Sequence, residues 1–94
     1  ATIELDEDGF SNSIINIYPN PAIDIINIDV AGNLKYEATI FDLQGRIMIR
    51  EINKSAINIQ TLPHGTYLIE IEDLVTGQKV IEKIIKSNYN FKIN

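Results

Sequence analysis

The chain has 94 residues, no cysteine and a formal net charge of −5. This length accommodates one domain with a single modest core. The lack of cysteine excludes a disulfide framework and a thiolate metal site. No run approaches the roughly 20 apolar residues that a membrane-spanning helix needs. Four acidic side chains lie within residues 1–8, so the rest of the chain is nearly neutral and lacks the basic field of a nucleic-acid binder.

Isoleucine dominates the apolar content and indicates β structure. The chain holds 20 isoleucines but only 5 alanines. Side chains branched at Cβ favour a pleated, half-buried surface over a helix. We therefore expect an all-β fold.

Residues 1–13 predict an acidic, polar linker because they show no apolar period. They do not resemble a signal peptide, which is basic and then apolar, and the chain has the character of a piece of a longer protein. Asp6-Glu7-Asp8-Gly9 is similar to part of a calcium loop. The glutamate that such a loop places about six residues beyond the glycine is missing, so we do not expect calcium binding.

The clearest local pattern is a strand, a rigid corner and a second strand. The apolar run Ile14 to Tyr18 meets Pro19-Asn20-Pro21, whose prolines fix φ and lack N–H donors, so the chain must turn. Alternation resumes in the strand Ile25 to Val30. We expect the alternate isoleucines of both strands to face the core: Ile15, Ile17, Ile26 and Ile28.

Two further strands are expected to form a hairpin. Lys35 to Leu43 carries apolar residues on both sides, which predicts a central strand. In the turn Asp42 to Arg46, the Asp42 side chain can accept from the backbone two residues on, and Gly45 can take the positive φ of a type I turn with a bulge. The strand Arg46 to Glu51 should place Ile47 and Ile49 on the same side.

The remaining strands are a short one at Ala56 to Gln60, with Ile57 and Ile59 inward, and one that begins after the corner Leu62 to Tyr67. Tyr67, Ile69 and Ile71 should face the core. A final strand, Gln78 to Ile85, has an ambiguous facing and basic residues typical of a sheet edge. Together the pattern predicts an immunoglobulin-like antiparallel β-sandwich of about seven strands.

Residues with catalytic potential are few. His64 lies in a turn and should point to solvent, and the serines have no recognisable base partner. The rings of Tyr36, Phe41 and Tyr67 are more consistent with core packing than with a sugar platform, since tryptophan is absent. We expect no enzyme activity, no cofactor and no metal site.

Four ordered blocks resemble a known family. They are Tyr18-Pro19-Asn20-Pro21-Ala22, Phe41-Asp42-Leu43-Gln44-Gly45-Arg46, Leu62-Pro63-His64-Gly65-Thr66-Tyr67-Leu68-Ile69 and Lys83-Ile84-Ile85-Lys86. Their order and spacing, from about Ser13 to Lys86, are similar to the C-terminal sorting domain (type A) of the type IX secretion system of Bacteroidota.

The resemblance implies a non-catalytic sorting signal. Such a domain follows a cargo domain in the same chain and directs it through the periplasm and outer membrane to the cell surface. The resemblance implies recognition by the type IX translocon and by a cell-surface sortase. Transferred by position, the recognition motifs are Pro19, Asn20, Pro21, Gly45, Arg46, Gly65, Tyr67, Lys83, Ile84, Ile85 and Lys86. Cleavage would fall in the linker, around Gly9, Phe10, Ser11, Asn12 and Ser13.

The chain departs from the family pattern at its end, because residues 87–94 continue beyond the basic strand where family members commonly stop. The expected division is therefore a linker (1–13), a sandwich (14–86) and an extension (87–94). Two other functions stay open: an accessory carbohydrate-binding or adhesive module, and a structural spacer. If a partner recognises the closing strand, it could do so by pairing one of its own strands with this sheet edge.

Overall fold

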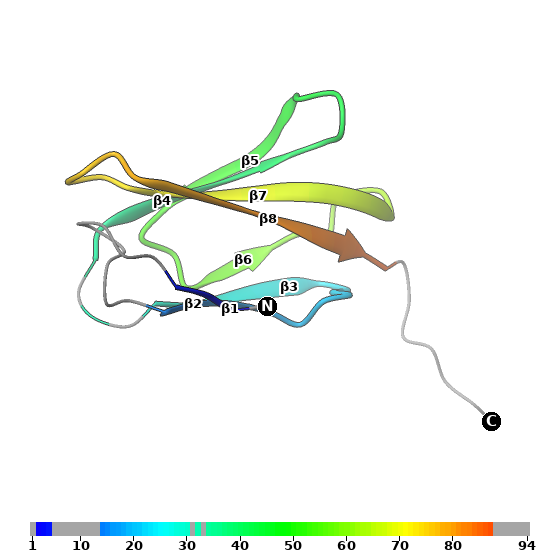
Figure 1. The fold of residues 1–94 in the computed structure, drawn as a ribbon. Helices are drawn as coiled ribbons and strands as arrows, with labels where there is room; N and C mark the ends of the chain where they lie inside the picture. Colours follow the sequence, from blue (N-terminus) through cyan, green and yellow to red (C-terminus); the bar gives the residue numbers. More distant parts are fainter. Residues whose placement is uncertain (1, 5–13, 31, 33, 88–94) are drawn as a thin grey trace.

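The computed structural model describes residues 2–4, 14–30, 32 and 34–87. These residues form two four-stranded antiparallel sheets that lie face to face (Figure 1). One sheet has the strand order β1-β2-β3-β6 and the other β5-β4-β7-β8. The all-β, immunoglobulin-like sandwich is thus confirmed, with seven strands between Ile14 and Lys86.

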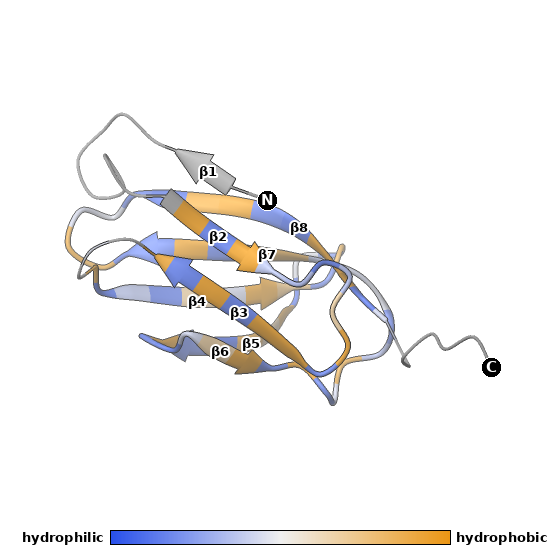
Figure 2. Cartoon of the chain, turned by 90° about the horizontal axis from the view of Figure 1, so that it is seen from below, coloured by the Kyte–Doolittle hydropathy of each residue, from blue (hydrophilic) through white to orange (hydrophobic). Residues whose placement is uncertain are grey.

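The first sheet is built around the two strands with the clearest alternation. Its strands are β1 (Thr2–Glu4), β2 (Ile14–Tyr18), β3 (Ile25–Val30) and β6 (Ala56–Asn58). The bounds of β2 and β3 agree with those expected, and Ile17 lies opposite Ile28 in their ladder. Apolar and polar residues alternate along both strands in Figure 2.

The strand β1 lies within the segment where we expected a linker. It pairs antiparallel with β2, with Ile3 opposite Ile15. Three residues give too short a pattern to indicate a strand, so the neighbouring strand decides its pairing. Residues 5–13, which hold the calcium-like run and the candidate cleavage region, lie outside the described residues, as do residues 88–94 of the extension.

The second sheet carries three of the four motif blocks. Its strands are β4 (Tyr36–Phe41), β5 (Ile47–Ile52), β7 (Gly65–Asp73) and β8 (Lys79–Lys86). As expected, β4 is central, between β5 and β7, and β8 is an edge strand.

The core between the sheets is mostly isoleucine. Ile40, Ile59, Ile69 and Ile71 are fully buried there. Each such side chain contributes about 2 kcal/mol through removal of apolar surface from water. The buried apolar residues are Ile15, Ile17, Ala22, Ile26, Ile28, Tyr36, Ala38, Ile40, Ile57, Ile59, Leu62, Tyr67, Ile69, Ile71, Val80 and Ile84.

The expected facing of β5 is wrong at its start. Ile49 is half-buried against the core, but Ile47 is 50% exposed. The ladder between β4 and β5 shifts register between Ile40 and Phe41, which marks a β-bulge. An extra residue in one strand reverses the side on which the preceding residues point.

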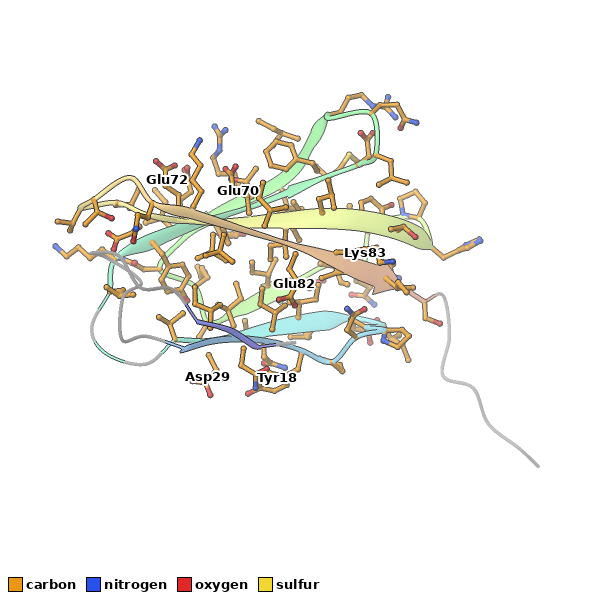
Figure 3. The ribbon with its side chains drawn as sticks, viewed as in Figure 1. Tyr18, Asp29, Glu70, Glu72, Glu82 and Lys83 are labelled. Atoms are coloured by element: carbon orange, nitrogen blue, oxygen red, sulfur yellow. The ribbon has the colours of Figure 1, made fainter. Side chains whose placement is uncertain are left out.

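The facing of β8, ambiguous in the sequence, is definite in the structure. Val80 and Ile84 point into the core, while Ile81 and Ile85 point outward. Lys83 shares the outward side and is exposed, and Lys86 shares the inward side and is buried. Figure 3 shows Lys83 directed away from the other sheet and Glu82 directed toward it.

Candidate recognition surface

The four motif blocks meet at one end of the sandwich. The β4–β5 hairpin, the turn before β7, the β2–β3 corner and the end of β8 all lie on the right in Figure 1. The ladders agree with this view, because Gly65 lies opposite Lys86 and Ala22 forms a parallel bridge with the same lysine. We call this part of the molecule, residues 18–22, 41–46, 62–67 and 83–87, the motif end.

The proline corner holds the edge of β8 through an asparagine side chain. Asn20 donates from Nδ2 to the Lys83 carbonyl at 3.0 Å, and its Oδ1 accepts from the Ile85 N–H at 2.9 Å. The side-chain amide thereby takes the place of a peptide group in a ladder. The peptide bonds before both Pro19 and Pro21 are cis.

The backbone of the corner continues this pairing. The Ala22 N–H donates to the Ile85 carbonyl at 2.8 Å, and the Ser87 N–H donates to the Ala22 carbonyl at 2.7 Å. An unpaired strand edge presents free N–H and C=O groups that another chain can bind. Asn20 and Ala22, which we call the edge cap, occupy these groups at Lys83, Ile85 and Ser87.

The second block forms the expected hairpin turn. Oδ1 of Asp42 accepts from the backbone N–H groups of Gln44 and Arg46, each at 2.9 Å. Oδ2 accepts from Arg46 Nε at 2.6 Å. Gly45 has φ of +89°, a conformation that costs a residue with a Cβ. The N–H of Arg46 and its guanidinium together lower the pKa of Asp42, against the opposing effect of burial.

The third block fixes the entry to β7. The Tyr67 hydroxyl donates to the Pro63 carbonyl at 2.7 Å, a short-range bond of the kind found at the tyrosine corner of immunoglobulin-like folds. The Tyr67 ring is 6% exposed and belongs to the core. His64 is exposed, as expected, and Gly65 begins the strand.

The second and third blocks enclose a shallow, open pocket of about 240 Å³. Arg46 contributes to it from the hairpin turn, Met48 from β5, and His64 from the turn before β7. The full lining is Asp42, Leu43, Gln44, Arg46, Met48, Pro63, His64, Gly65, Thr66 and Tyr67. No local pattern indicates this pocket, since one wall comes from the β4–β5 hairpin and the other from the connection between β6 and β7.

The two lysines of the closing block have different environments. Lys83 is exposed beside the edge cap. Lys86 is 5% exposed, and its Nζ donates to the Ser87 carbonyl at 3.0 Å. Of the residues transferred from the family pattern, Arg46 and Lys83 therefore present charge to solvent, whereas Asn20, Gly45, Tyr67, Ile84 and Lys86 shape or stabilise the motif end.

The described residues contain no group of three or more His, Cys, Asp or Glu side chains placed to hold a metal ion. In the same part of the chain, no helix is long and apolar enough to cross a membrane. What the motif end offers is a surface: two exposed cations, a shallow pocket and a rigid backbone held by hydrogen bonds.

Comparisons with known proteins identify the fold and the family of the chain. A structure of PorZ, described as an essential bacterial surface component of the type IX secretion system of Porphyromonas gingivalis, shares the fold with a TM-score of 0.63 at 16% identity. The match covers 79% of this chain and only 11% of the PorZ chain. The search of curated proteins gave no match. The family model for the secretion system C-terminal sorting domain matches residues 16–90, which include all four motif blocks, and the chain therefore belongs to that family.

Proposed function

We propose that this domain is a non-catalytic signal that directs a cargo domain, preceding it in the same chain, through the type IX secretion system to the cell surface. The translocon and the sortase would recognise the domain as a folded unit. The observation that carries this proposal is the convergence of four separate motif blocks on one end of the sandwich. A recognition surface needs residues from distant parts of the chain to be held together. The edge cap, the turn from Asp42 to Arg46 and the corner from Leu62 to Tyr67 hold these residues in place.

The exposed charges on the motif end are the features that a partner can read. Arg46 has a side chain that is 75% exposed although it binds Asp42, and Lys83 is exposed at the end of β8. Charged groups at the rim of an interface steer association and set specificity. We therefore assign recognition to Arg46 and Lys83, and a structural role to the buried Lys86.

Strand addition to the closing end of β8 has little support. The edge cap already occupies the backbone groups of Lys83, Ile85 and Ser87, so an added strand would first have to displace Asn20 and Ala22. A sugar platform made of Tyr36 and Tyr67 has no support either, because both rings are buried and both hydroxyls donate to backbone carbonyls.

A reporter fusion tests the proposal. Residues 1–94 are joined to the C-terminus of a periplasmic reporter in a bacterium with a working type IX system, and surface and periplasmic fractions are compared. The fusion is expected at the surface, and retention in the periplasm would contradict the proposal. Lys83→Glu should reduce export several-fold, whereas Lys79→Glu, on the outward side of the same strand but away from the motif end, should not. Equal export of the two variants would remove Lys83 from the recognition surface.

A further inference from the structure

The sheet β5-β4-β7-β8 has a second edge, formed by β5. At the other edge, the cap on β8 leaves Lys83, Ile85 and Ser87 paired. β5 is the last strand of the sheet on the opposite side, the uppermost strand in Figure 1. Among the described residues, no strand pairs with this outer edge of β5.

The backbone groups that face this edge can be assigned from the ladder. Asn53 donates its N–H to the Tyr36 carbonyl, and its side chain accepts from the Tyr36 N–H, each at 2.9 Å. Because residues of an antiparallel ladder bond to their neighbour alternately, Ile49 and Glu51 also bond to β4. Arg50 and Ile52 then direct their N–H and C=O groups away from the sheet.

The edge of β5 lacks lysine and proline, two of the usual kinds of protection. Natural sheet edges are blunted by charged side chains, above all lysine, by proline or by a bulge. β5 contains neither lysine nor proline, and its bulge lies at its start, beside Phe41. Ile47 and Ile52 are 50% and 56% exposed. The regular part of this edge, residues 49 to 52, carries Arg50 and Glu51 beside its isoleucines, and its outer side is available for pairing with another strand.

The outward face of β5 specifies what a pairing strand must carry. Ile52, Arg50 and Ile47 lie opposite Glu37, Thr39 and Phe41 of β4, so they share one face. This is the face of Glu70 and Glu72, which point away from the other sheet in Figure 3. The sequence of side chains along this edge is therefore apolar, cationic, apolar.

Arg50 has capacity for a second acidic partner. Its Nε lies 3.6 Å from Glu37 Oε2, longer than a hydrogen bond, and its side chain is 55% exposed. A guanidinium has five N–H donors, so one distant carboxylate leaves several of them available. Opposite charges directly across two strands stabilise the pair, and like charges destabilise it.

From these observations we infer that β5 is a docking edge for an extended segment of a partner protein, with an acidic residue opposite Arg50 and apolar residues two positions to either side. The inference rests on the proposed function, since it names a chemistry for the recognition partner.

A second copy of this chain is a poorer occupant. Glu51, the one carboxylate of β5, lies opposite Ala38 and hence on the other face. In any symmetric pairing of two β5 strands that continues the sheet, Arg50 would meet an arginine or an apolar residue. The edge thus has no complementary charge to offer itself.

The first test uses two short synthetic peptides, Val-Thr-Glu-Thr-Val and the same peptide with Lys in place of Glu, titrated into the ¹⁵N-labelled domain. The Glu peptide should slow amide exchange at Arg50 and Ile52, and leave Ile49 and Glu51 unchanged. It should bind about tenfold more tightly than the Lys peptide, because of the charge across the strands. Arg50→Glu should reverse this preference. Equal binding of both peptides to both proteins, protection centred on β8, or no protection at about 1 mM peptide would overturn the inference.

Two matched variants carry the test into cells. Ile52→Lys and Ile81→Lys each place a charge on an exposed isoleucine of the same sheet face, 56% and 58% exposed, at opposite edges. Urea unfolding confirms that both variants fold. Ile52→Lys should abolish the change in amide exchange and reduce export of the fusion, while Ile81→Lys should do neither. If the unmodified fusion reaches the surface and the two variants are exported equally, the assignment of β5 as a docking edge is wrong and the sorting function stands. If the unmodified fusion is retained in the periplasm, the sorting function itself is contradicted. Dimerisation of the domain that Ile52→Lys prevents would assign the edge to a second copy instead.

Discussion

Asn20→Ala gives a direct measure of the edge cap. The substitution removes two hydrogen bonds, at 3.0 Å and 2.9 Å, between a side chain and the backbone of β8. Each such bond contributes about 0.5–1.5 kcal/mol net. Both lie at the exposed surface, where water can replace the lost partner, so the lower half of that range applies. We expect a loss of about 1–2 kcal/mol in the free energy of unfolding, which lowers the melting temperature by about 4–8 °C per kcal/mol.

Urea unfolding of the purified domain measures this loss, and amide exchange locates it. Asn27→Ala is the matched control, because the Asn27 side chain makes one longer bond, 3.3 Å, to the Tyr18 carbonyl. It should cost less than about 0.5 kcal/mol. The Ile85 amide should exchange faster in Asn20→Ala and be unaffected in Asn27→Ala. Equal stability of the two variants, or an unchanged Ile85 amide, would refute the role given to Asn20.

Three other substitutions test the second and third blocks. Gly45→Ala forces a Cβ into a conformation with φ of +89° and should cost about 1–2 kcal/mol in urea unfolding, whereas Gln44→Ala, in the same exposed turn, should cost little. Tyr67→Phe removes the bond to the Pro63 carbonyl and should cost about 1 kcal/mol; a smaller loss than in Tyr18→Phe, whose ring is 44% exposed, would contradict the corner. The pKa of Asp42 is lowered from 3.8 in the folded state, so its carboxylate stabilises the fold above about pH 4 and the stabilisation is lost as the pH falls through the folded-state pKa. The stability advantage of the unmodified domain over Asp42→Asn should therefore shrink in acid, and a constant difference from pH 7 to pH 3 would argue against this linkage.

Local patterns in the sequence predicted local structure well. The alternation of Ile15 and Ile17, the turn chemistry of Asp42 with Gly45, and the solvent-facing His64 are all as expected. Each depends on neighbours within a few residues, which set turn types and the side on which a side chain points.

The incorrect and missing predictions depend on tertiary pairing. Ile47 points outward because of the bulge beside Phe41. This part of the sequence has no glycine or proline that would indicate a bulge within the strand. Both sides of β8 carry apolar residues, so only the packing of the sheets decides that Val80, Ile84 and with them Lys86 face inward. The bonds of Asn20 to β8 and the pocket beside Arg46 join distant segments, and no local pattern reports such a contact.

The edge cap also sets an order of events in folding. The bond from the Ile85 N–H to Asn20 spans 65 positions, so it cannot form until the segment containing β8 has been synthesised. Contacts of such long sequence separation form late, because closing a long loop costs entropy before the contact stabilises it. Until then, the side-chain amide of Asn20 and the backbone N–H and C=O of Ala22 are hydrated rather than bonded to β8. A chain cut short before Lys83 would lack both partners of Asn20, so closure of the cap distinguishes a complete sandwich from an unfinished one.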